Sequence, residues 1–182
     1  DTTGYDVRPI DINIPVATDL EFAVKGKDVV FVAVQTPHDE DYDGKYPSSH
    51  LKPSDFDYTI AKDAISKVDK LVDSQTLIVL ISTVLPGTVR REIAPLVKNG
   101  RFIYNPYLIA QGTVKADMYN PEMIMIGTEK GEENQDFLLL KHIYHDICHK
   151  EPRIELGTWE EIESMKIFYN TFITAKLCLV NM

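Results

Sequence analysis

Residues 76–88 read TLIVLISTVLPGT, and this stretch decides the fold. Its first half is a short run of branched apolar residues, which is typical of a strand buried on both faces of a sheet. Pro86 suits the first turn of a helix, and Gly87 lets the backbone pass close to a ligand. The stretch therefore predicts a buried strand that ends at Ser82 and Thr83 and leads into a helix over residues 87–97.

Three other segments repeat this pattern, in which an apolar run stops at polar or turn residues: 28–34 before Gln35-Thr36-Pro37, 101–104 before Asn105-Pro106, and 124–126 before Gly127. Helical spacing of apolar residues covers 56–72, 87–97 and 132–148. Alternating strands and helices with short connections imply right-handed crossovers and a parallel sheet. We expect an α/β fold, a partial Rossmann-like doubly wound parallel sheet, with four strands presenting polar residues at one edge. Ligands bind at that edge in such sheets.

The length of the chain and the positions of its proline and glycine residues suggest one hydrophobic core followed by a shorter additional segment. A chain of 182 residues with 44% hydrophobic content can bury one substantial core. Pro152 and Gly157 mark a boundary, so we expect a sheet domain over 1–152 and the start of a long central helix over 153–182. That helix has a broad apolar face, which needs further protein or a second subunit to cover it, and we expect a homodimer through it.

Composition narrows the classes of partner. A net charge of −9 argues against nucleic acid, and no apolar run reaches the length of a membrane span. Cys148 and Cys178 give no disulfide framework and are expected to be packed free thiols rather than nucleophiles. Three histidines, at positions 142, 145 and 149, recur at helical spacing, but no carboxylate arrangement completes a metal site. We expect a cytoplasmic protein that binds neither metal, nucleic acid nor membrane.

Taken together, the motifs resemble the UDP-glucose/GDP-mannose 6-dehydrogenase family in their order and spacing. The resemblance runs from about Asp19 to the last residue. It rests on the segments DVVFVAVQTP at 28–37 and STVLPGT at 82–88, and on Asn105-Pro106, Gly112-Thr113, Asp117, Asn120-Pro121, Ile126-Gly127, Glu163, Lys166, Asn170 and Lys176.

Membership in this family would imply an NAD-dependent enzyme that oxidises the C6 hydroxyl of a nucleotide-linked hexose, of the UDP-glucose type, to the uronate. Two hydride transfers occur, and a cysteine thiol captures the aldehyde between them. By this resemblance the catalytic residues are Thr83, Lys166 and Asn170. The cofactor-binding residues are Gln35, Thr36, Pro37, Ser82, Thr83 and Gln111, and the substrate-binding residues are Asn105, Tyr107, Leu108, Lys166 and Asn170.

The spacing of Lys166 and Asn170 independently supports their assignment. Residues four apart share one face of a helix, and a fixed ammonium beside an amide donor is the charge that a developing alkoxide needs. The competing interpretation is a solvated lysine on an amphipathic helix. Glu163, one turn earlier, is expected to be a helix-surface partner or a supporting group rather than an acid catalyst.

Several positions depart from the family pattern. Tyr107 replaces the usual glutamate after Asn-Pro, Gln111 replaces an acidic residue, and Met123 replaces an arginine. No Gly-x-Gly-x-x-Gly occurs among the nine glycines, and no Gly-rich segment surrounds a cysteine, so we interpret the chain as the middle of a longer protein, inactive on its own. Two alternatives stay open: a related hydroxyacid-type dehydrogenase, or a catalytically silent homologue that binds nucleotide sugar or oligomerises.

Overall fold

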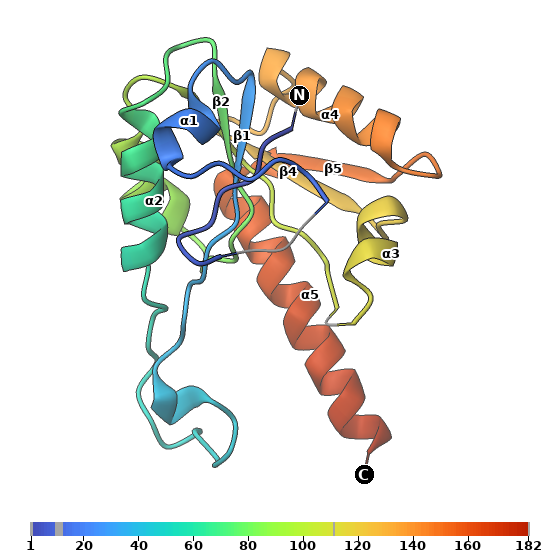
Figure 1. Cartoon of the computed structure of the whole chain (residues 1–182). Coiled ribbons are helices and arrows are strands. Elements are labelled where there is room, and N and C mark those ends of the chain that lie inside the picture. The colour runs from blue at the N-terminus through green and yellow to red at the C-terminus, as the bar shows by residue number, and fades with distance from the viewer. Residues whose placement is uncertain (1, 10–12, 111, 182) are drawn as a thin grey trace.

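The computed structural model describes residues 2–9, 13–110 and 112–181. Its centre is a five-stranded sheet in the order β1-β2-β3-β4-β5, with helices on both faces (Figure 1). The strands are β1 (Val29–Val32), β2 (Leu77–Leu80), β3 (Arg101–Tyr104), β4 (Ile124–Thr128) and β5 (Ile154–Thr158). The predicted α/β class is confirmed, and the pairing is mostly parallel.

The helices that pack around this sheet are α1 (Leu20–Val24), α2 (Thr59–Asp69), α3 (Val114–Tyr119), α4 (Gln135–Ile147) and α5 (Trp159–Val180). The predicted helices over 56–72 and 132–148 correspond to α2 and α4. The predicted helix over 87–97 is instead a π-helical turn, η2 (Val89–Ile93), followed by a 3-10 turn, η3 (Ala94–Leu96). Pro95 lies in η3 and has no backbone N–H to donate, which explains why a regular α-helix does not continue there.

Strand direction changes once across the sheet. β1, β2 and β3 are parallel, with Val30 opposite Ile78 and Ile78 opposite Phe102, whereas β3 and β4 are antiparallel. The expectation that four strands end at one edge is therefore wrong for β4, which runs in the opposite direction, although its Gly127 pairs with Tyr104, the last residue of β3. The reason is the path of the chain: residues 105–123 leave β3 and enter β4 at the same edge, so no crossover to the other edge is made.

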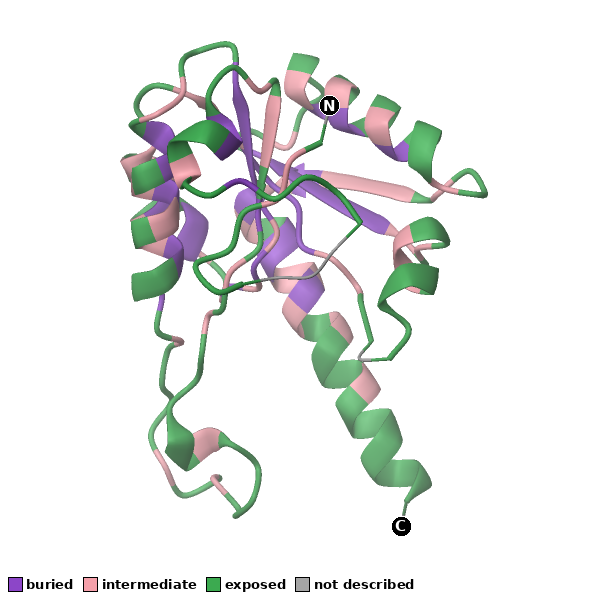
Figure 2. Cartoon of the chain, in the orientation of Figure 1, coloured by how far each residue is buried: buried purple, intermediate pink, exposed green. Residues whose placement is uncertain are grey.

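Alternate residues of the strands pack on opposite faces, and together they form two cores. Ile78 and Leu80 lie in one core with residues of α2 and α5, whereas Leu77 and Val79 lie in the other with residues of α4. All four residues of β2 are buried, as predicted for a strand covered on both sides (Figure 2). The sheet is thus doubly wound.

The long C-terminal helix crosses the sheet and then leaves it. Thr158 ends β5 and caps α5 through a capping box with Glu161, so α5 begins beside β3, near Phe102. Trp159 packs edge-on against Phe102 near the start of β3, with 5.8 Å between the rings. The buried residues of α5 lie in its first two turns, and its C-terminal half is mostly exposed and projects from the body (Figures 1 and 2). α5 therefore carries its side chains toward the edge where β1–β3 end.

β5 also bears on the domain division. Residues 154–158 pair with β4 along their whole length, so this segment belongs to the sheet. The division at residue 152 stays a prediction.

Candidate active site

The carboxyl ends of β1, β2 and β3 lie side by side and are joined by side-chain hydrogen bonds. The Ser82 hydroxyl donates to the Val34 carbonyl (2.6 Å) and accepts from the Val34 amide (3.0 Å). The Thr36 hydroxyl donates to the Thr83 carbonyl (2.7 Å). These bonds continue the contact between β1 and β2 past their last paired residues. We call the resulting fixed edge, made by residues 34–37 and 82–83, the rim; it comprises the two segments predicted to bind cofactor.

The rim leaves three of the predicted cofactor residues available to a ligand. Gln35 and Pro37 are exposed, and Thr83 is half-buried. Within the described part of the chain, the Thr83 hydroxyl makes no hydrogen bond, whereas the Ser82 and Thr36 hydroxyls are both engaged in the rim. Gln111, the remaining predicted cofactor residue, lies outside the described residues.

The loop after Thr83 is held by side chains from three distant segments. The Val84 amide donates to the Tyr104 hydroxyl (3.4 Å), and the Leu85 amide donates to the Tyr58 hydroxyl (3.2 Å). The Gly87 and Val89 amides both donate to the Glu163 carboxylate, at 2.5 and 2.7 Å. Gly87 has φ +86°, a value that L-residues with a side chain rarely adopt. Glu163 is fully buried, so the expectation of a helix-surface partner is wrong and that of a supporting group fits.

Lys166 lies inside the site. Its side chain comes from α5, the residue is only 6% exposed, and its ammonium donates to the Tyr107 carbonyl just after β3 (2.7 Å). No carboxylate pairs with it among the described residues. Burial lowers the pKa of the Lys166 ammonium, because desolvation disfavours the charged form. An ammonium has three N–H donors, and only one is used by the described residues, so the group can serve an additional acceptor.

Asn170 lies one turn beyond Lys166, on the same side of α5. It is exposed, and its side-chain amide makes no hydrogen bond within residues 112–181 or the other described segments. The neighbouring Tyr169 donates to the Glu122 carboxylate, which fixes this turn of α5 to the loop before β4. Asn170 is thus placed at the outer end of the site with a free amide.

Asn105 is held inside the protein. It is fully buried, its amide nitrogen donates to the Met125 carbonyl (2.7 Å), and its amide oxygen accepts from the Tyr144 hydroxyl. Both ends of the side chain are therefore engaged, and its predicted binding of substrate stays a prediction. Tyr144, on α4, was not singled out from the sequence, where it reads as one more apolar position of that helix.

The side chain of Tyr107 does not face Lys166. Its ring packs into the core under α4, with 5.8 Å between the ring centres of Tyr107 and Tyr144. Its hydroxyl is buried without a partner among the described residues, and burial raises its pKa to about 12. Leu108 packs into the core on the opposite face of the sheet. At position 107 the backbone carbonyl, rather than the side chain, therefore meets the predicted catalytic lysine.

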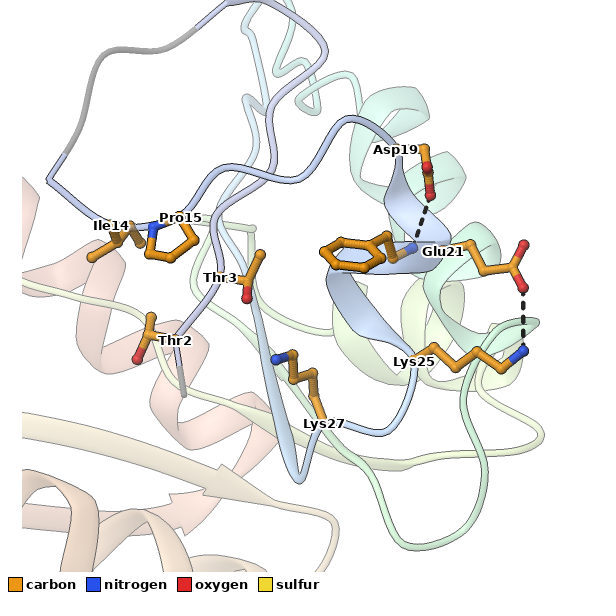
Figure 3. Close-up of a pocket in the computed structure, with 9 residues that line it drawn as sticks. Thr2, Thr3, Ile14, Pro15, Asp19, Glu21, Lys25 and Lys27 are labelled. Carbon is orange, nitrogen blue, oxygen red and sulfur yellow. Dashed lines mark hydrogen bonds and ion pairs between the residues drawn. The ribbon is translucent and has the colours of Figure 1, made fainter.

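Two hollows lie away from this rim. A cavity of about 1100 Å³ lies between the N-terminal segment and α1, where Lys27 precedes the start of β1. Figure 3 shows the residues that line it. An open groove of about 700 Å³ follows the outer side of α5 from Glu160 to Phe172. No predicted site residue lines either hollow, so the rim rather than a deep pocket is the candidate site.

Within the described residues, no three His, Cys, Asp or Glu side chains are grouped so that they could hold a metal ion. None of the helices described there combines the length and the apolar character that crossing a bilayer requires.

Comparison with known proteins identifies the family. The model of the UDP-glucose/GDP-mannose dehydrogenase family, NAD binding domain, matches residues 9–148. UDP-glucose 6-dehydrogenase of Drosophila melanogaster is 26% identical over 94% of this chain, and that of Rickettsia prowazekii is 28% identical over 85%. GDP-mannose dehydrogenase of Pseudomonas aeruginosa, solved as a ternary complex, superposes with a TM-score of 0.75 at 25% identity over 92% of this chain.

The matches cover only part of each relative. The chain spans 36% of the Drosophila protein, 33% of the Rickettsia protein and 37% of the Pseudomonas structure. A UDP-glucose dehydrogenase of Pyrobaculum islandicum, with a TM-score of 0.67 over 87% of this chain, has the same fold. The family expected from the motifs is confirmed: the chain belongs to the UDP-glucose/GDP-mannose dehydrogenase family, and residues 9–148 match its NAD binding domain.

Proposed function

We propose that the polypeptide carrying this chain oxidises the C6 hydroxyl of a nucleotide-linked hexose, of the UDP-glucose type, to the carboxylate with NAD in two hydride transfers. Beyond the family, one observation supports this most strongly. The Lys166 ammonium is buried, and among the described residues its hydrogen-bond partner is the main-chain carbonyl of Tyr107. It therefore lies at the end of β3, next to the end of β2, which precedes Thr83. A desolvated cation with spare donors is costly to keep and suits a developing oxyanion.

The rim fits NAD at the position where open α/β sheets bind their ligands. Exposed Gln35 and Pro37 flank the end of β1, and Thr83 flanks the end of β2, so a flat ring can rest across both. When bound, NAD supplies the hydride acceptor. The Ser82 and Thr36 hydroxyls hold the rim in place rather than contacting the ligand, and the Thr83 hydroxyl is free to orient substrate or water.

Lys166 and Asn170 would act on the oxygen at C6. The Lys166 ammonium donates to the alkoxide as the hydride leaves, and the Asn170 amide donates from one turn further along α5. The C6 hydroxyl must also lose its proton, and the lowered pKa of Lys166 would make its uncharged amine available to accept that proton and become the ammonium. Lys166 is buried where α5 packs on the sheet, and a charge interaction is stronger in such surroundings than in bulk water.

NADH formation with UDP-glucose, GDP-mannose and their N-acetylated relatives tests the proposal. Loss of an oxyanion donor costs roughly 10²–10³-fold in turnover, and we expect this for Lys166→Ala with NAD affinity nearly unchanged. Lys67→Ala is the control, because Lys67 is exposed on α2 and pairs with Asp63 on the same helix, away from the rim. Wild-type turnover in Lys166→Ala would remove this lysine from the mechanism.

A catalytically silent homologue is the second candidate, and the Tyr107 side chain favours it. The carboxylate that the family resemblance places after Asn-Pro is absent, and the tyrosine ring lies in the core. A silent protein would bind NAD and a nucleotide sugar in calorimetry without forming NADH. A hydroxyacid-type dehydrogenase would instead form NADH with small 2-hydroxy acids and ignore nucleotide sugars.

We also propose that two copies associate through α5. Its C-terminal half exposes large apolar side chains, including Phe168 at 73% and Phe172 at 66%. Contiguous exposed apolar surface of this kind marks interaction sites. Sedimentation velocity tests the proposal: Phe168→Glu should shift a dimer toward monomer, and an unchanged sedimentation coefficient would contradict it.

A further inference from the structure

The Glu163 carboxylate is buried and is bound by main-chain amides alone. The residue is fully buried, its Oε2 accepts from the Gly87 amide at 2.5 Å, and its Oε1 accepts from the Val89 amide at 2.7 Å. No lysine or arginine forms an ion pair with it among the described residues. Burial raises the pKa of this carboxyl, while the two amides favour its ionised form. Because both oxygens are engaged in the loop, Glu163 is not free to reach a substrate.

Those two amides belong to the loop that follows Thr83. In the same loop, the Val84 amide donates to the Tyr104 hydroxyl and the Leu85 amide to the Tyr58 hydroxyl, so four of its amides donate to side chains. The Thr83 hydroxyl stays outside this set of bonds. Glu163 is the only one of the three anchoring residues that comes from α5, and its bonds are the two shortest of the four.

Lys166 lies one turn after Glu163 on α5, a rise of about 4.5 Å along the helix axis. Glu163 ties α5 to the loop after β2, and Lys166 ties it to the Tyr107 carbonyl after β3. β2 and β3 are neighbouring parallel strands, so α5 is fastened across two adjacent strand ends. The hydrogen bonds from the Gly87 and Val89 amides to Glu163 therefore set the separation between Thr83 and Lys166.

We propose that Glu163 is a positioning residue that fixes the Thr83 loop relative to Lys166, and that it acts on turnover rather than on cofactor affinity. This inference rests on the proposed dehydrogenase function. A misplacement of about 1 Å at a reacting centre can cost on the order of 10²-fold in rate. Glutamine keeps the shape of Glu163 but turns an amide N–H₂ toward one of the two backbone donors, so one bond is lost. Aspartate keeps the charge on a shorter side chain.

Glu163→Gln and Glu163→Asp would be compared with Glu160→Gln in the full polypeptide that carries this chain. Glu160 lies one turn earlier on α5 and pairs with Arg90 at the surface, so its loss removes a similar charge while the Gly87 and Val89 amides keep their bonds to Glu163. Steady-state NADH formation gives kcat and the two KM values, normalised to the folded fraction from circular dichroism. Amide hydrogen exchange at residues 84–89 reports directly on the hydrogen bonds between this loop and Glu163.

We expect Glu163→Gln to lower kcat roughly 10- to 100-fold with the KM for NAD within about threefold of wild type. Exchange at Gly87 and Val89 should become faster, Glu163→Asp should fall between Gln and wild type, and Glu160→Gln should match wild type. Wild-type kcat in folded Glu163→Gln, or unchanged exchange at Gly87 and Val89, would overturn the assignment. If the wild-type protein forms no NADH with any nucleotide sugar, the proposed function fails, and exchange alone then decides whether Glu163 holds the loop.

Discussion

Replacing Lys166 by methionine should make the protein more stable. The wild-type ammonium is almost fully buried and donates one hydrogen bond, to the Tyr107 carbonyl. Burying such an ion costs several kcal/mol, and one charge-assisted hydrogen bond returns about 1.5–3 kcal/mol. Methionine has a similar length and pays no such desolvation, although the Tyr107 carbonyl then loses its partner at about 1 kcal/mol.

The balance favours Lys166→Met by roughly 1 kcal/mol at neutral pH. For a chain of this length that corresponds to a rise of about 3 °C in the unfolding temperature. Differential scanning calorimetry measures it, with Lys67→Met as the exposed control, for which no rise is expected. A loss of more than 1 kcal/mol in Lys166→Met would refute the idea that this lysine is kept at a cost to stability.

The same variant has a defined pH dependence. The folded pKa of Lys166 lies below its ordinary value of 10.5, so the folded chain releases this proton at a lower pH than the unfolded chain. Between these two pKa values the unfolded state binds more protons, and the stability of the wild type gains with rising pH. The advantage of Lys166→Met should therefore be full below the folded pKa and shrink as the pH approaches 10.5.

Two further predictions concern buried polar side chains that hold the backbone or another side chain in place. Tyr144→Phe removes the donor to the buried amide oxygen of Asn105 and should lower the free energy of unfolding by about 2 kcal/mol in urea titration, whereas Tyr119→Phe, at an exposed position, should change it little. Asp69→Ala removes a buried carboxylate that accepts the backbone amides of residues 98–100, and should cost about 3 kcal/mol or more; a loss below 1 kcal/mol would contradict that network.

Most of the fold could be predicted from the sequence because its signals are local. The apolar run before Ser82 and the helical spacing of α2 and α4 are contained in short windows. The direction of β4 could not be predicted in this way. An apolar run has the same pattern in a parallel and in an antiparallel strand, and the direction depends on the edge at which the preceding connection enters the strand. β5 was also missed, since IELGT is short, partly polar and next to Pro152.

The candidate site shows the same division. Thr83 and Lys166 can be predicted because they belong to motifs; in the structure Lys166 contacts the Tyr107 carbonyl after β3, and β3 pairs with β2, whose end precedes Thr83. The hydrogen-bond partners of Asn105 and Glu163 could not be predicted from the sequence, because they are the Met125 carbonyl, 20 positions away, and the Gly87 amide, 76 positions away. Such contacts follow from the antiparallel β4 and from the course of α5 across the sheet.

The most direct test of the proposed site is a crystal structure of the protein with NAD and a nucleotide sugar bound. The nicotinamide should rest across the ends of β1 and β2, between Pro37 and Thr83, with the C6 oxygen of the sugar within hydrogen-bonding distance of the Lys166 ammonium. A dinucleotide bound elsewhere, such as in the cavity beside α1, or a sugar remote from Lys166, would contradict the site.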